Sequence, residues 1–408
     1  MKTATSAYTA IINSGSAYHK IKIMFGQVEV TDNIVSMTYT GVMHDSSAVT
    51  FGNACSATVE LVLESPPTEA TSKNVTISLG VEIDDGDDET ENEIEWKKLG
   101  TFTITEKKIE KTQVTYTMYD YMASKLNKRY KSFLDWSSPV STIDIQEEIT
   151  GATDVTFGTG TADEFMLTSF PQQCTYRDMI GLMAGLIGRD AVVNENGVIE
   201  YRCYQKVADF SIDADNVYED EFKKEDTDTF NFKKVSCAVT DDTTISSAER
   251  EATGAHTIIG ISNPYITQTI MDDYIYPATG RTINNYFTEN FTPTEIKMVG
   301  NPCIEVGDII SVYEDGQNYI DAYVMKVTHE YDGGLITTIE STAETEEAQA
   351  MQYVSPSSGG SSSGGGGGNI TVDSEMSSTS TNPVQNKVIY AYIGNIGEVL
   401  DAIQGEVI

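Results

Sequence analysis

The side chains that could do chemistry in this chain are few and widely separated. The four histidines are isolated, with no H-x-x-H or H-E-x-x-H spacing that would hold a metal ion: His19, His44, His256 and His329. The five cysteines are scattered in the same way and never form a C-x-x-C pair: Cys55, Cys174, Cys203, Cys237 and Cys303. Their odd number and spacing indicate buried thiols of a protein made in a reducing cytoplasm, not a disulfide framework or a zinc site.

Catalytic interpretations find little support in these residues. Cys174 stands just ahead of a predicted helix, whose N-terminus could lower the pKa of the thiol and activate a nucleophile; the alternative is a structural thiol. Pairs of carboxylates suited to glycoside cleavage occur anywhere in a chain with 62 acidic residues, so they do not discriminate. The sequence contains no G-x-S-x-G elbow and no P-loop. We therefore expect no enzymatic activity, no cofactor and no metal site.

The densest group of candidate ligands is the acidic run from Glu82 to Glu95, which holds nine carboxylates in fourteen positions. Clustered carboxylate oxygens are what calcium prefers, but the run lacks the D-x-[DN]-x-[DN]-G spacing of a calcium loop. The alternative is a solvated tip between two strands, whose charges repel one another. We favour the tip, and calcium binding stays open.

The overall charge excludes several classes of partner. With 62 acidic and 26 basic residues the formal charge is -36, which repels nucleic-acid phosphates and anionic lipid. We expect no sequence-specific nucleic-acid binding. The sequence has no apolar stretch of membrane-spanning length and its N-terminus has no signal-peptide core, so we also expect no membrane anchor.

The hydrophobic pattern predicts a mainly β, α+β protein of several domains. Residues 1–115 alternate apolar and polar positions and predict a first β-domain, an antiparallel sheet or a small barrel, with a turn at Lys97 to Gly100. Residues 116–207 form an α+β module with helices at Tyr121 to Lys131 and Thr142 to Ile149. A third helix begins at Thr175, where Asp178 completes a capping box, and a hairpin turning at Asn196-Gly197 follows it.

Residues 208–345 return to strands and predict a second β-domain, with a small insertion near 268–292; its barrel-like form, like that of the first, is implied by the family resemblance given below. Its last part reads as a meander of three strands. Ile304 and Val306 fall on one face of the first strand, and Tyr319 to Thr328 reads as a single middle strand, because apolar residues occupy both of its faces.

The last part of the chain is a tether followed by a short helix. Residues 346–368 form a flexible Gly/Ser linker, and residues 369–408 a fibre-like element that ends in a heptad seam. The seam positions follow a 4, 3, 4, 3, 4 spacing: Ile389, Ile393, Ile396, Leu400, Ile403 and Val407. Isoleucine-rich a and d layers favour trimers or tetramers, so we predict an oligomerisation site. The alternative is an amphipathic helix that packs on its own chain or docks another protein.

Several stretches resemble phage tail hub proteins, the family that forms the baseplate hub and its tail-tip relatives. GNPCIEVGDIISV and the strands after it are similar to the closing segment of that family, and KLGTFTITEKKIEKTQVTYTMYDYMASKLNKRY to the passage between its first two domains. TYRDMIGLMAGLIGRDAVVNENGVIEY resembles the helix and hairpin of its second domain. MSSTSTNPVQNKVI resembles a short element of phage tail-fibre and tail-tip proteins.

The resemblance implies a structural protein of the virion tail tip, assembled in the host cytoplasm. It implies a homotrimer whose barrel-like domains form a ring, which adapts the sixfold tail to a threefold tip and lets DNA pass. The expected partners are the distal tail or tail tube protein, the C-terminus of the tape-measure protein, and a spike or fibre protein. The alternative function is a receptor-binding tail-tip adhesin that recognises host surface glycans through its tyrosine-rich sheets.

Overall fold

The computed structural model gives the fold of the chain in two compact units, residues 1–356 and residues 357–408. It describes residues 2–44, 50–68, 70–83, 93–158, 160–171, 174–203, 210–212, 216–224, 231–238, 245–249, 256–275, 293–315, 318–341 and 353–354. All of these residues belong to the first unit. The predicted linker and heptad seam lie outside them, apart from residues 353–354.

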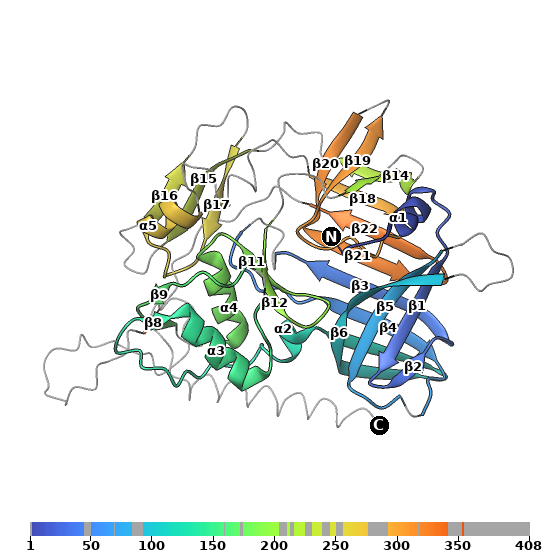
Figure 1. Ribbon diagram of the computed structural model, residues 1–408, viewed down its shortest axis with the longest axis horizontal. Coiled ribbons are helices and arrows are strands. Elements are labelled where there is room, and N and C mark those ends of the chain that lie inside the picture. Colours follow the sequence, from blue (N-terminus) through green and yellow to red (C-terminus); the bar gives the residue numbers. More distant parts are fainter. Residues whose placement is uncertain are drawn as a thin grey trace, which may run out of the picture. The chain divides into compact units, whose positions relative to one another are not determined.

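One antiparallel sheet dominates the first unit and confirms the mainly β prediction (Figure 1). Its strand order is β14-β18-β22-β21-β3-β4-β7-β6-β5-β1-β2. The N-terminal part of the chain contributes β1 His19–Phe25, β2 Val28–Val30, β3 Ile34–Val42, β4 Thr58–Glu64, β5 Asn74–Ile83, β6 Glu93–Glu110 and β7 Gln113–Tyr119. The C-terminal part contributes β14 Val217–Lys224, β18 Thr294–Val299, β21 Lys326–Tyr331 and β22 Leu335–Glu340.

The two parts of this sheet meet at the antiparallel pair β3–β21, where Tyr39 lies opposite His329. Residues from the predicted first and second β-domains therefore share one continuous ladder. The predicted domain boundaries at 115, 207 and 345 remain predictions, since residues 1–356 form one compact unit.

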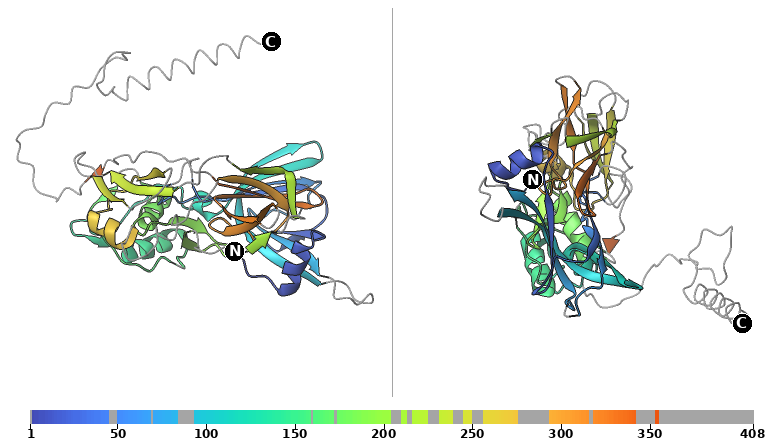
Figure 2. Two further views of the ribbon diagram at one scale, coloured as in Figure 1. Left: turned by 90° about the horizontal axis from the view of Figure 1, so that it is seen from above. Right: turned by 90° about the vertical axis from the view of Figure 1, so that its right-hand side faces the viewer.

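Smaller sheets and short helices complete the unit (Figures 1 and 2). The short strands are β8 Val140–Ser141 with β9 Met166–Leu167, β10 Phe170–Pro171 with β23 Tyr353–Val354, β11 Asp190–Val193 with β12 Ile199–Arg202, β13 Phe210–Ile212 with β19 Ile309–Asp315 and β20 Asn318–Tyr323, and β15 Asn231–Ala238 with β16 Ile245–Glu249 and β17 His256–Ile261. The helices are α1 Ser6–Asn13, α2 Tyr121–Ser124, α3 Thr142–Thr153, α4 Tyr176–Gly185, α5 Gln268–Ile270 and the π-helical turn η2 Met271–Ile275.

The predicted capping box sets the start of α4. The Thr175 hydroxyl accepts the Asp178 amide at 3.0 Å, and the Asp178 carboxylate accepts the Thr175 amide at 2.8 Å. Because these bonds satisfy amides that the first turn leaves without helical partners, the helix begins here. The predicted hairpin also forms, with Gly197 in the left-handed region at φ +81°.

Four details of the prediction are wrong. The expected turn at Lys97 to Gly100 is instead a bulge inside β6, because Ile77 pairs with Gly100 while Ser78 pairs with Lys98. The helix expected over Tyr121 to Lys131 stops at Ser124. Beyond it the chain pairs with the segment before α4, the Tyr130 amide donating to the Cys174 carbonyl at 2.8 Å.

The single middle strand expected over Tyr319 to Thr328 is two strands in different sheets. β20 pairs with β19, β21 pairs with β22 and β3, and the chain crosses between the sheets at Val324 and Met325. Apolar residues occupy both faces because the buried face changes at this crossing. Ile304 and Val306 are buried as expected, but they lie in a loop rather than a strand.

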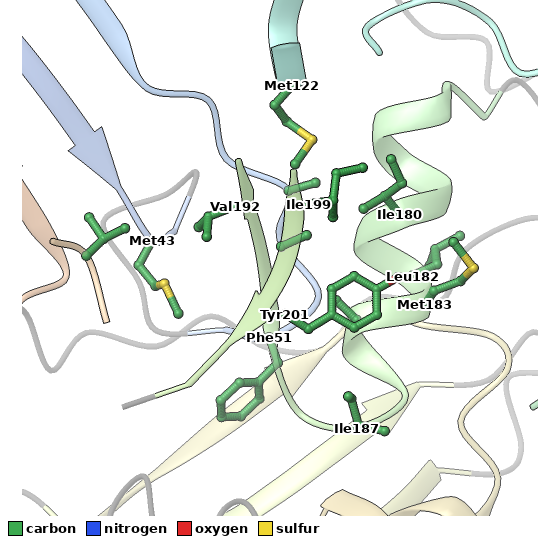
Figure 3. Packing of buried hydrophobic residues seen from close by; sticks show 14 of the residues in the cluster. Met43, Phe51, Met122, Ile180, Leu182, Met183, Ile187, Val192, Ile199 and Tyr201 are labelled. Atoms are coloured by element: carbon green, nitrogen blue, oxygen red, sulfur yellow. The ribbon is translucent and has the colours of Figure 1, made fainter. Parts of the chain in front are cut away.

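Two main cores hold the unit together. One lies under the N-terminal strands and includes Ile23, Phe25 and Met37. The other joins α3, α4 and the β11–β12 hairpin to β19, β20 and β21, and Figure 3 shows part of it around Ile199 and Tyr201. This shared core fixes the α+β module against the C-terminal strands, since its side chains come from both.

Helix α4 approaches the loop around Gly52 more closely than side chains would allow. A Cβ added at Gly181 would lie 2.4 Å from the Gly52 carbonyl oxygen, and one at Gly185 would lie 3.2 Å from the Gly52 Cα. Gly52 itself has φ +81° and donates its amide to the Arg189 carbonyl at 3.0 Å. Glycines on both sides therefore allow this backbone-to-backbone contact.

We predict that Gly181→Ala lowers the free energy of unfolding by about 1–3 kcal/mol, because the new methyl group meets backbone that cannot move aside. The matched control is Gly151→Ala in α3, where an added Cβ meets nothing within 4 Å. That change should be neutral or stabilising by up to ~1 kcal/mol, since alanine favours the helix. Urea unfolding of both variants measures the difference, and equal values would contradict the proposed contact.

Candidate functional site

Some of the residues predicted to carry function are described by the structure, and others lie outside the described residues. The six heptad positions lie outside the described residues, so the oligomerisation site remains a prediction. Most of the acidic run also lies outside them. Its described ends belong to β5 and β6, which pair directly at Ile83 and Glu93, so the run joins two neighbouring strands as expected. Whether it binds calcium stays open.

The described ends of the acidic run are held by lysines. Glu82 lies 3.6 Å from the Lys20 ammonium, and Glu95 binds Lys97 while accepting the Thr5 amide at 3.2 Å. Among the residues that the structure describes, no group of three or more histidine, cysteine or acidic side chains could hold a metal ion.

The three histidines whose side chains the structure describes, His19, His44 and His329, are each buried with a polar contact. The His19 ring nitrogen Nε2 lies 2.8 Å from the Gly300 carbonyl oxygen, and His329 Nδ1 lies 2.9 Å from the Thr337 hydroxyl. His44 Nδ1 lies 3.6 Å from the Asp190 carboxylate. Burial lowers the pKa of His44 to about 4 and that of His329 to about 3, so both rings are neutral at pH 7.

Cys174 does not have the lowered pKa that its position before α4 suggested. Burial raises the pKa of the thiol, and the nearby Asp178 carboxylate raises it further. The Met179 amide in the first turn of α4 lowers this pKa, but by less than burial and Asp178 raise it. The thiol is therefore structural, which corrects the nucleophile alternative.

The main polar centre of the described chain is a cluster of charges around Glu305, which sequence patterns did not predict. Its carboxylate lies 3.6 Å from the Arg202 guanidinium and 4.0 Å from the Lys2 ammonium, and Arg202 also binds Glu200 at 3.0 Å. The Glu305 amide donates to the Asp308 carboxylate at 2.8 Å. These residues come from the N-terminal segment, β12 and the loop before β19, so the cluster ties three distant parts of the chain together.

The N-terminal segment adds further ties to this cluster. The Lys2 amide donates to the Cys303 carbonyl at 3.0 Å, and the Lys97 ammonium donates to the Thr3 carbonyl at 2.6 Å. Helix α1 then buries Tyr8 and Ile12 against Val81 and Cys303. The segment that precedes β1 is thus an integral strap across β5, β6 and the loop before β19.

A small pocket lies beside the charged cluster. Its lining includes Tyr39, Leu99, Asp120, Val193, Arg202 and Glu305. The charged groups in it already have protein partners. Asp120, whose pKa burial raises to about 6, accepts the Ser56 hydroxyl at 2.7 Å, the Ala57 amide at 2.8 Å and the Met122 amide at 2.9 Å. The pocket therefore lies in a structural contact between the large sheet and the α+β module.

The outer surface offers a different kind of site. Several large apolar side chains are exposed, most of all Phe133 at 93%, then Ile109 at 65% and Tyr18 at 60%. Large apolar side chains left exposed on a protein surface are candidates for contacts with other proteins. No helix among the described residues is long and apolar enough to cross a membrane.

No protein-family model matches the chain, and the search of curated proteins found no match. Solved structures do match. The tail protein from Neisseria meningitidis is 10% identical, with a TM-score of 0.52, and the match covers 79% of this chain and 95% of that chain. A prophage 43 kDa tail protein from Shewanella oneidensis is 11% identical, with a TM-score of 0.46, covering 79% and 98%. A prophage tail protein from Listeria monocytogenes is 8% identical, with a TM-score of 0.47, covering 80% and 95%.

The match to the Neisseria protein shows that this chain has the fold of a tail protein. At 10% identity it establishes the fold and leaves the function to be argued from the chain itself.

We predict that Glu305→Gln lowers the free energy of unfolding by about 1–3 kcal/mol, because it leaves the partly buried Lys2 ammonium without its carboxylate partner and leaves Arg202 with Glu200 alone. The matched control is Glu340→Gln. Glu340 pairs with Lys326 at 2.6 Å, but both side chains are well exposed, and the change should cost less than ~1 kcal/mol. Chemical unfolding at pH 7 measures both values.

The pH dependence gives a second check on the same variant. Burial alone would raise the pKa of Glu305, but the charges of Lys2 and Arg202 outweigh burial and hold it below its usual 4.5. A carboxylate with a lowered folded pKa stabilises the protein above its unfolded pKa and loses this effect as the pH falls through the folded value. The difference between wild type and variant should be full at pH 7 and shrink below pH 4.5. A difference that does not change with pH would contradict the ionised cluster.

Proposed function

We propose that this chain is a structural subunit at the tip of a phage tail or of a phage-tail-like particle, without catalytic activity. Three copies would form a hub ring that adapts the sixfold tail to the threefold tip and lets DNA pass. The observation that carries the proposal is the fold shared with the Neisseria tail protein over 95% of that chain. The order of the tail-hub-like segments in the sequence supports the more specific hub role.

The physical character of the chain supports this proposal. A ring through which DNA slides must not bind phosphate, and a subunit with a formal charge of -36 would repel it. The charged groups of the described pocket are already paired with other groups of the same chain, which is consistent with a structural role. The partners we propose are the distal tail or tail tube protein, the C-terminus of the tape-measure protein, and a spike or fibre protein at the tip.

The function is tested on the purified full chain and on intact particles. Sedimentation equilibrium should give the mass of three chains. Gold-labelled antibodies against the chain should mark the tail tip in electron micrographs. A chain that remains monomeric at all concentrations, or label along the whole tail, would argue against the hub.

We predict that deleting residues 355–408 leaves the ring trimeric and removes attachment of the protein below it. The reason is that ring contacts in a hub of this kind bury a large area, well above ~2,000 Å², whereas a heptad run of under three repeats with several glycines is marginal alone. Sedimentation measures the first effect, and particle composition measures the second. A monomeric deletion variant would instead assign trimer formation to Ile389, Ile393, Ile396, Leu400, Ile403 and Val407.

A further inference from the structure

Phe133 is the most exposed large apolar side chain in the described part of the protein, with 93% of its surface accessible. It lies in the loop between α2 and β8. Its neighbours Tyr130 and Trp136 are buried, at 2% and 9% exposure. One aromatic ring therefore projects outward from a loop whose other aromatic rings point into the protein.

The loop is held firmly in this conformation by Glu148 on α3. The Glu148 carboxylate accepts the Phe133 amide at 2.5 Å and the Ser132 hydroxyl at 2.8 Å, and it also accepts the Tyr130 hydroxyl. The Trp136 ring nitrogen donates to the Ser132 hydroxyl at 2.9 Å. Bonds to an ionised acceptor are among the stronger hydrogen bonds, so the loop around Phe133 is preorganised.

The base of the loop is fixed as well. The Tyr176 amide donates to the Lys128 carbonyl at 3.0 Å, and the Tyr130 amide donates to the Cys174 carbonyl at 2.8 Å. The rings of Tyr130 and Trp136 each lie 5.3 Å from the ring of Phe170. Phe133 is thus presented by a rigid support and would lose little conformational freedom on binding.

The loop that carries Phe133 also holds three exposed basic side chains. Lys128, Arg129 and Lys131 are exposed, and within the described residues none of the three has an ion-pair partner. Asp135, the acidic side chain of this loop, is engaged with the Ser137 amide at 3.0 Å. In a chain with 62 acidic and 26 basic residues, such a group of uncommitted cations marks a surface suited to an acidic partner.

We infer that Phe133, with Lys128, Arg129 and Lys131, forms a knob that docks onto a second copy of this chain. The inference rests on the self-association in the proposed function and names a contact for it. Copies with a formal charge of -36 repel one another, so they associate only where local contacts reverse that repulsion. An exposed aromatic ring with a basic rim, set against the acidic surface of the next copy, supplies both apolar burial and opposite charge.

The test uses the full chain, with Phe133→Ser compared with wild type by sedimentation equilibrium. The association constant should fall by about tenfold or more, as expected for losing a preorganised aromatic hot spot. The matched control is Met166→Ser, since Met166 is 57% exposed but its charged neighbours along the chain, Asp163 and Glu164, are acidic. Met166→Ser should leave the association constant unchanged. Thermal unfolding should show that both variants are folded.

A second variant and a cross-link test which protein the Phe133 knob binds. Glu148→Gln keeps the shape of the side chain but weakens its bonds to the loop, and it should weaken association less than Phe133→Ser. A photoreactive phenylalanine analogue at position 133 should cross-link to another copy of this chain, seen as a doubled mass.

The outcomes separate the inference from the proposed function. Wild-type association that is unchanged in Phe133→Ser overturns the knob and leaves the proposed ring intact. A wild-type chain that does not associate overturns both. A cross-link to a different tail protein, or Phe133-dependent binding to anionic vesicles without self-association, overturns the knob as a contact between copies.

Discussion

The pairing of β3 with β21 is the interaction on which the rest of the described structure depends. It runs from Met37 opposite Tyr331 to Val42 opposite Lys326 and joins strands from opposite ends of the described chain. His329 lies in the middle of this pairing, fully buried, with its ring stacked on Tyr39 at 5.6 Å. Its lowered pKa keeps the ring neutral at pH 7, so no charge is buried between the two strands. Separating the two strands would expose this ring and a row of backbone donors and acceptors.

The elements predicted correctly from sequence are those whose determinants lie close together along the chain. The capping box at Thr175 and Asp178 places the start of α4, and Asn196-Gly197 places the turn between β11 and β12. The Glu82–Glu95 run joins two paired strands, because the alternation on either side of it is local. In each case neighbouring residues decide the conformation before any long-range contact forms.

The details that sequence could not give depend on contacts between distant residues. α2 is short because the residues after it pair with the segment before α4, and the crossing at Val324 and Met325 exists because two sheets meet there. The charged cluster around Glu305 joins residues about three hundred positions apart, so no spacing reveals it. The exposure of Phe133 could not be predicted from the sequence either. An apolar residue between Ser132 and Leu134 is expected to be buried, and the bond from the Phe133 amide to Glu148 depends on the fold.

The pairing of basic side chains within the chain affects the charge of its surface. Several of the scarce basic side chains serve contacts within the chain: Lys2 and Arg202 bind Glu305, Lys20 binds Glu82, and Lys223 binds Glu295. This leaves a surface on which negative charge predominates, so most encounters between copies are repulsive. Specific association then requires the few places where cations remain uncommitted, because only there does approach become favourable. The excess of acidic residues would thus restrict which surfaces can serve the proposed association between copies.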